Sequence, residues 1–193
     1  MIQICLSTVF LKIAMENLET FNPDQIAVVN NGVAMSEELV SNFYKMSASQ
    51  WLSRRYDIKT LADLNPEETV SGPFAQVIRY QGQRKDASLS SAAYDFYKIC
   101  LQDHAILAAI AQSPGIKLLP FILYIVTHEL IHIVRFSKFL QGFDASQNEI
   151  AAEETRVHEI TREILGPVGI LGLDKVLKFY DKWRQPIDDL NIS

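Results

Sequence analysis

Cysteine is scarce in this sequence, and the few that occur are isolated. The 193 residues include two cysteines, Cys5 and Cys100, and neither belongs to a C-x-x-C pair. A zinc site made of thiolates and a dithiol redox motif are therefore not expected. Lone cysteines in apolar surroundings predict buried, reduced thiols, which favours a cytoplasmic location, with a single disulfide between the two as the alternative.

Clustered positive charge is also lacking. The formal net charge is −5, and the densest basic patches, at residues 54–55 and 79–85, are short and broken. Because phosphate binding needs a clustered positive face, we expect no nucleic-acid partner. The chain also lacks a nucleotide-binding glycine loop, a phosphate loop and a Ser-His-Asp arrangement.

Long apolar runs are few. Residues 1–14 are apolar but lack a basic start and are interrupted by Lys12, so a secretory signal is not favoured and secretion remains the alternative. Residues 118–126 are too few to span a bilayer, and charged or polar side chains follow almost at once. This second run predicts a helix buried in protein, and we expect no membrane partner.

The composition that remains is that of a soluble globular domain. Hydrophobic residues make up 48% of the chain and charged residues 21%, and 193 residues fit one domain. We predict a single, mostly helical domain of the α+β class over residues 1–193. Residues 1–115 would form strands and helices with a small N-terminal sheet, and residues 116–193 would form a pair of metal-binding helices and a C-terminal helix.

Residue patterns predict the elements of the N-terminal half. In chain order they are strands at 2–13 and 25–30, a turn at 30–32, a helix capped by Ser36 that runs to residue 52, a loop at 63–68, a strand at 74–80 and a helix at 91–112. The last of these has a competing interpretation as a strand at 94–101, because aromatic residues and isoleucine are dense there.

Three helices are expected in the C-terminal half. The first opens near Pro120, since proline suits a first turn, and runs to about residue 140. The second covers Gln147–Leu165 and stops at a Gly-Pro pair, and the third covers residues 173–183.

The first of these helices contains the sequence His128-Glu129-Leu130-Ile131-His132. Histidines four residues apart lie on one face of a helix, so both imidazoles can reach one metal ion. Glu129 is rotated by about 100° from His128, where its carboxylate can contact a water on the metal without being a ligand. The motif therefore predicts one zinc ion per chain, bound by His128 and His132, with Glu129 as the general base.

Two histidines leave a catalytic zinc one protein ligand short. The helix at Gln147–Leu165 offers several candidates, and at about 100° per residue Glu153 and Glu154 both border its apolar face. Glu154 is preferred because His158 lies one turn later and can support it. Glu153, Glu149 and His158 itself remain alternatives for the third ligand.

An H-E-x-x-H helix followed by a helix rich in glutamate resembles the gluzincin metallopeptidases, the group that includes thermolysin-like and neprilysin-like enzymes. The resemblance covers residues 127–165, and the run from Glu154 to His158 is similar to the E-x-x-x-polar pattern of the second gluzincin helix. It implies a zincin-like pair of helices, a glutamate as third ligand and a peptide or protein substrate. Few residues follow, so this would be a small peptidase that grips its substrate partly with its N-terminal half, where the strand at 74–80 could pair with an extended peptide.

Other polar residues have less specific interpretations. His104 falls on the apolar face of its predicted helix, which favours a core histidine over one that supports the metal. Four tyrosines are candidates for polarising a substrate carbonyl beside the zinc, although core packing explains each of them equally well: Tyr94, Tyr97, Tyr124 and Tyr180.

Three functions compete. The leading hypothesis is a zinc-dependent hydrolase, a small gluzincin-like metallopeptidase. The second is a non-catalytic binding or regulatory module with a zinc site, which a fourth protein ligand would favour. The third is a carboxylate-bridged di-iron helical protein, since Glu129 and His132 form an E-x-x-H unit, but Glu154 and His158 are one residue too far apart to form the second. The oligomeric state is left open.

Overall fold

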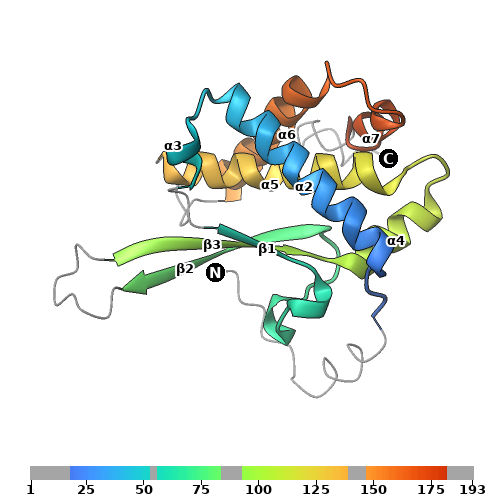
Figure 1. The fold of residues 1–193 in the computed structure, drawn as a ribbon, viewed down its shortest axis with the longest axis horizontal. Coiled ribbons are helices and arrows are strands. Elements are labelled where there is room, and N and C mark those ends of the chain that lie inside the picture. The colour runs from blue at the N-terminus through green and yellow to red at the C-terminus, as the bar shows by residue number, and fades with distance from the viewer. Residues whose placement is uncertain (1–17, 53–55, 84–92, 139–146, 182–193) are drawn as a thin grey trace.

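A helix layer packs on one face of a small sheet (Figure 1). The computed structural model describes residues 18–52, 56–83, 93–138 and 147–181. This arrangement is a mostly helical α+β fold with a three-stranded mixed sheet, as the sequence predicted. The elements are α2 (Pro23–Phe43), α3 (Ala48–Leu52), β1 (Tyr56–Lys59), 3₁₀ turns at Leu61–Asp63 and Pro66–Glu68, β2 (Ala75–Gln83), β3 (Ala93–Leu101), α4 (Asp103–Gln112), α5 (Leu118–Ser137), α6 (Gln147–Leu165) and α7 (Leu173–Phe179).

Helix α5 is the centre of the fold. Every residue from Pro120 to Arg135 is buried except Glu129, because α2, α6, α7 and the sheet all pack around it. The helix is long and apolar enough to cross a membrane by length and composition, so the apolar stretch is longer than the sequence suggested. However, 83% of that stretch is buried inside the protein, and a buried core helix meets the same criteria of length and composition.

The sheet has the order β1-β3-β2, with β3 in the middle. β1 pairs with β3 in parallel and β2 pairs with it antiparallel, which places Val77 opposite Ile99. The aromatic and β-branched side chains of β3 favour a pleated strand, and Ile99 is fully buried. The helix predicted at 91–112 is therefore wrong over its first half, and the competing strand at 94–101 is confirmed.

Helix α2 corrects three further predictions. The strand at 25–30, the turn at 30–32 and the helix cap at Ser36 all lie inside this single helix. The helix begins earlier because Asn22 and Gln25 form a reciprocal capping box and Pro23 occupies the first turn. These local signals outweigh the strand propensity of the two valines that follow.

Gly32 has a packing role instead of a turn role. A Cβ atom at this position would lie 2.7 Å from Cγ2 of Ile122 on α5, so only glycine allows the two helices to approach this closely. One turn later, the buried hydroxyl of Ser36 donates to the carbonyl of Gly32 over 2.9 Å. Small residues on this face of α2 thus set its distance from α5.

We expect Gly32→Ala to lower the free energy of unfolding by about 1–2 kcal/mol. The overpacking against Ile122 costs more than the roughly 1 kcal/mol that alanine contributes to helix propensity. The matched control is Asn31→Ala on the exposed face of α2, which gains propensity with no clash and should be neutral or stabilising. Urea denaturation measures the free energy of unfolding of the two variants. Equal effects of Gly32→Ala and Asn31→Ala would contradict the packing role of Gly32.

Of the remaining predictions for helices and strands, some are confirmed and others are not. Helix α6 has its predicted bounds, α5 has Pro120 in its first turn, and α7 begins at Leu173 as expected but ends at Phe179. The loop predicted at 63–68 contains the 3₁₀ turn Pro66–Glu68 and begins at the last residue of the turn Leu61–Asp63, and β1 was not predicted. Cys100 is a buried free thiol, while Cys5 and the strand at 2–13 fall outside the described residues.

Candidate metal centre

His128 and His132 present their imidazoles on the same face of α5, as their spacing predicted. Their Nε2 atoms lie 3.2 Å apart, and both residues are buried. The surrounding turns of the helix are apolar and enclosed, so the backbone that carries the two rings is rigid. Two nitrogen donors therefore converge at one point on the surface of the core helix.

Glu154 reaches the same point from α6. One carboxylate oxygen lies 3.3 Å from Nε2 of His128, and the other lies 3.2 Å from Nε2 of His132. Burial raises the pKa of Glu154, but hydrogen bonds from the two imidazoles outweigh this and hold the pKa far below its usual value. The carboxyl group is therefore an anion, the form in which carboxylates bind metals.

These three side chains pass a geometric test for zinc. Zinc bonds of about 2.0–2.1 Å in a tetrahedron place neighbouring donor atoms about 3.3 Å apart. The Nε2 atoms of His128 and His132 are 3.2 Å apart, and they lie 3.3 Å and 3.2 Å from the two different oxygens of Glu154. Two imidazoles and one carboxylate are also a donor set of catalytic zinc sites. The residues present therefore offer the donor types of a zinc site, at spacings close to those of neighbouring zinc ligands.

The two other glutamates considered for this role lie elsewhere. Both oxygens of Glu153 face the guanidinium of Arg135 on α5 in a buried, bidentate pair, with Nη2 donating to Oε2 over 2.9 Å. Glu149 is exposed in the first turn of α6. Among the glutamates that were considered, Glu154 is therefore the one placed at the histidines.

Arg135 is a residue that the sequence analysis missed. An arginine three residues after His132, inside an otherwise apolar helix, has to find a buried partner. That signal was present in the sequence, and it would have pointed to a carboxylate on the neighbouring helix. The bidentate pair with Glu153 fixes α6 against α5 at the level of the histidines.

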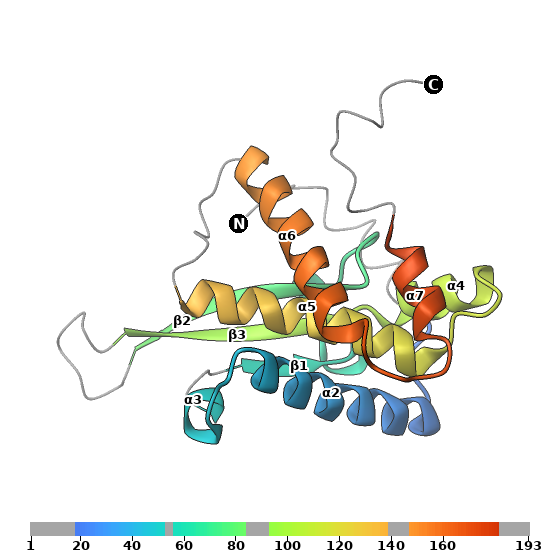
Figure 2. The ribbon, with the colours of Figure 1, turned by 90° about the horizontal axis from the view of Figure 1, so that it is seen from above.

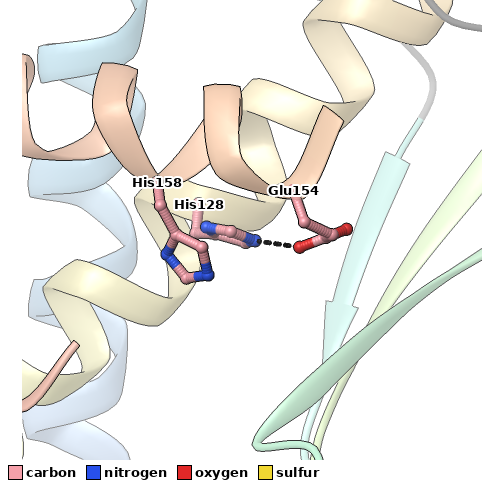
Figure 3. Close-up of side chains that lie close together, drawn as sticks. All are labelled: His128, Glu154 and His158. Atoms are coloured by element: carbon pink, nitrogen blue, oxygen red, sulfur yellow. Dashed lines mark ion pairs between the residues drawn. The ribbon is translucent and has the colours of Figure 1, made fainter. Parts of the chain in front are cut away.

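His158 lies beside His128, one turn after Glu154 (Figure 3). Donor atoms of His128, Glu154 and His158 fall within 4.8 Å of one another, so these residues also form a group able to hold a metal. The Nδ1 atom of His158 is 2.8 Å from the hydroxyl of Tyr124 on α5. Three of the four histidines in the chain thus meet at this site, while His104 lies in α4 and is not part of the group.

Glu129 is the one residue of the central part of α5 that is not fully enclosed. Desolvation raises its pKa, and the neighbouring His128 and His132 oppose that shift. Burial raises the pKa of Cys100 on β3 to about 12, and the charges of Glu68 and, to a smaller extent, Glu129 add to that shift. A raised pKa of Glu129 suits a general base near neutral pH.

The tyrosine candidates separate into two groups. Tyr124 and Tyr180 lie at the site, with their rings stacked at a centroid distance of 3.9 Å. Tyr97 is buried on β3 against Phe136, which is a packing role. The side chain of Tyr94 falls outside the described part of the structure.

Comparison of the chain with protein-family models, with curated proteins and with solved structures found no match.

Proposed function

We propose that the protein is a zinc-dependent hydrolase, a small metallopeptidase that binds one zinc ion per chain through His128, His132 and Glu154. The observation that carries this proposal is the convergence of two imidazoles and one carboxylate: the Nε2 atoms of His128 and His132 lie 3.2 Å apart, and each faces one of the two oxygens of Glu154, at 3.3 Å and 3.2 Å. Neither the histidine pair nor the glutamate alone would indicate zinc, but the three together are its preferred ligands, with donor atoms spaced about as neighbouring zinc ligands are.

The chemistry follows from Glu129, which comes directly after His128 on α5. Zinc, when bound, polarises a substrate carbonyl and lowers the pKa of water. Glu129 would take a proton from the attacking water while the water oxygen forms a bond with the carbonyl carbon. The same carboxyl group would return that proton to the amide nitrogen as the C–N bond breaks, which regenerates the Glu129 carboxylate.

A peptide or protein is the substrate class that the sheet supports. Strand β2 pairs with β3 on one side and has no other partner strand among the described residues. Viewed from above the helices, β2 lies on the α6 side of α5 and β1 on the α2 side (Figure 2). A peptide in extended form could add to the β2 edge and present its backbone to the site. A cytoplasmic location remains a prediction.

The second candidate is a zinc-binding module without turnover. It is favoured by one observation, the presence of His158 in the group of possible metal ligands. A fourth protein ligand would close the position that a substrate needs. The di-iron alternative has less support, because the described residues contain no second E-x-x-H pair facing Glu129 and His132.

The metal content of untagged protein tests the proposal. We expect about one zinc per chain in the wild type and none in His132→Ala, since two remaining ligands bind zinc weakly. The matched control is His104→Ala, which removes a histidine outside the site and should retain the metal. Two irons per chain would favour the di-iron protein, and no metal after zinc is supplied would contradict the hydrolase.

A further inference from the structure

Aromatic rings flank the histidine pair on both sides along α5. The four rings occur at every fourth position of the helix, which places them in one row on its surface: Tyr124, His128, His132 and Phe136. The ring of Tyr124 is stacked on that of His128, with centroids 6.4 Å apart and an interplanar angle of 18°. The ring of Phe136 is stacked on that of His132, at 5.8 Å and 21°. Each proposed histidine ligand therefore has an aromatic neighbour one turn away on its own helix.

The two ends of this row are held by other parts of the fold. Beyond Tyr124, the ring of Tyr180, which directly follows α7, is stacked at 3.9 Å and 8°. Beyond Phe136, the ring of Tyr97 on β3 is stacked at 6.2 Å and 10°. Tyr180 and Tyr97 are both buried in the close-packed interior, so neither outer ring can move far. The C-terminal helix and the sheet thus restrain the two rings that flank the histidines.

Ring contacts are especially important at His128. A metal-binding histidine usually donates from its second ring nitrogen to a carboxylate, a carbonyl or water, and that bond fixes the plane of the ring. The Nε2 atom of His128 faces Glu154, while its Nδ1 atom is buried and has no hydrogen-bond partner among the described residues. Neighbouring rings, among them those of Tyr124 and His158, therefore restrict the rotation of this imidazole.

The flanking side chains do not compete with the histidines for the metal. Phe136 has no donor atom, and the hydroxyl of Tyr124 lies 2.8 Å from Nδ1 of His158, with which it forms a hydrogen bond. What the two rings can supply is restraint. A ligand side chain that is already held by packing loses less conformational freedom when the metal binds, so the metal is bound more tightly.

We propose that Tyr124 and Phe136 position the imidazoles of His128 and His132 by stacking, so that both ligands are held in place before zinc binds. This inference rests on the proposed function, because it requires the zinc site. Tyr124 and Phe136 are positioning residues, since they act on the metal through the histidines and do not touch it.

The zinc affinity of the purified full chain tests the inference, by competition with a chromophoric chelator. Phe136 is changed first, because it is only partly buried and its exchange should leave the fold intact. We expect Phe136→Leu to bind zinc about 3–10-fold more weakly than the wild type, as for the loss of one aromatic contact. Phe136→Tyr keeps the ring and should bind zinc within about twofold of the wild type.

The same comparison at the other end separates stacking from hydrogen bonding. Tyr124→Leu removes the ring, and we expect a loss of zinc affinity similar to that of Phe136→Leu. Tyr124→Phe keeps the ring and removes the hydroxyl that contacts His158, so its zinc affinity should stay close to that of the wild type. The matched control is Phe21→Leu, the same exchange at a buried phenylalanine outside α5, which should lower stability but leave zinc affinity unchanged.

Cobalt gives a second measurement that a general loss of stability would not alter. The visible absorption of Co²⁺ in place of zinc depends on the geometry of its ligands. We expect the spectrum of Phe136→Leu to differ from that of the wild type, because the imidazole of His132 is less restrained. The spectra of Phe136→Tyr and Phe21→Leu should match that of the wild type.

The outcomes distinguish this inference from the proposed function. Equal zinc affinities of the wild type, Phe136→Leu and Tyr124→Leu would overturn the inference and leave the zinc site intact. A loss in Phe21→Leu as large as that in Phe136→Leu would show a general effect of destabilisation, and would also overturn it. A loss in Tyr124→Phe as large as that in Tyr124→Leu would assign the effect to the hydroxyl and refute stacking at His128. A wild-type chain that binds no zinc would overturn the proposed function, and the inference with it.

Discussion

Replacing Glu129 by glutamine is expected to lower peptide hydrolysis by about 10²–10⁴-fold, because the amide cannot accept a proton from water. The variant should still bind about one zinc per chain, since the Glu129 carboxylate is not among the proposed ligands His128, His132 and Glu154. Cleavage is measured on a library of unstructured peptides by mass spectrometry of the new termini, and zinc is measured on the same samples.

The control for this variant is Glu159→Gln, the same exchange at an exposed position of α6. It should hydrolyse peptides like the wild type. Equal activity of the wild type and Glu129→Gln would contradict the general-base role. Loss of zinc from Glu129→Gln would instead show that the carboxylate holds the metal, and would favour the di-iron reading of the same E-x-x-H unit.

The second large effect is expected on stability, from Arg135→Met. This exchange leaves the carboxylate of Glu153 buried without its partner, which costs about 3–5 kcal/mol of the free energy of unfolding. The pair also holds α6 against α5, so its loss should weaken zinc binding by Glu154, although Arg135 does not touch the metal site. Urea denaturation and chelator competition measure the two effects.

Two controls separate a buried ion pair from ordinary loss of charge. Arg162→Met breaks the pair with Asp181, whose side chains are 45% and 41% exposed, and should change stability by less than about 1 kcal/mol. The double variant Arg135→Met with Glu153→Leu removes both buried charges and should recover most of the lost stability. Similar effects of Arg135→Met and Arg162→Met would contradict the structural role of the buried pair.

Part of the fold was predictable because the signals were local. The proline in the first turn of α5 and the Gly-Pro stop after α6 act within a few residues, and both helices lie where expected. The error at residues 25–36 has a different origin. The close contact between Gly32 and Ile122 joins residues far apart in the chain, so the sequence around Gly32 does not reveal it. The Asn-Asn-Gly sequence there favours a turn when it is considered alone, and a turn was predicted.

The candidate site also has one part that local signals predict and one part that depends on long-range contacts. The spacing of His128 and His132 sets their common face from the geometry of one helix, which a sequence contains. The choice between Glu153 and Glu154 depends on how α6 is rotated against α5, and both residues border the same face. One contact that holds this rotation is the pair between Arg135 and Glu153, which lie 18 positions apart in the chain. Helical periodicity alone therefore showed that both glutamates border the apolar face of α6, but it could not show which of them reaches the histidines.

The three proposed ligands differ in their contact with solvent. The side chains of His128 and His132 are 11% and 7% exposed, whereas that of Glu154 is 46% exposed. A hydrated ion arriving from solution therefore meets the carboxylate before it meets the imidazoles. In the proposed site, Glu154 would attract the ion electrostatically, and the histidines would then replace some of its water molecules. Release would run in the reverse order, so the buried imidazoles would govern the lifetime of a bound ion and the exposed carboxylate its rate of capture.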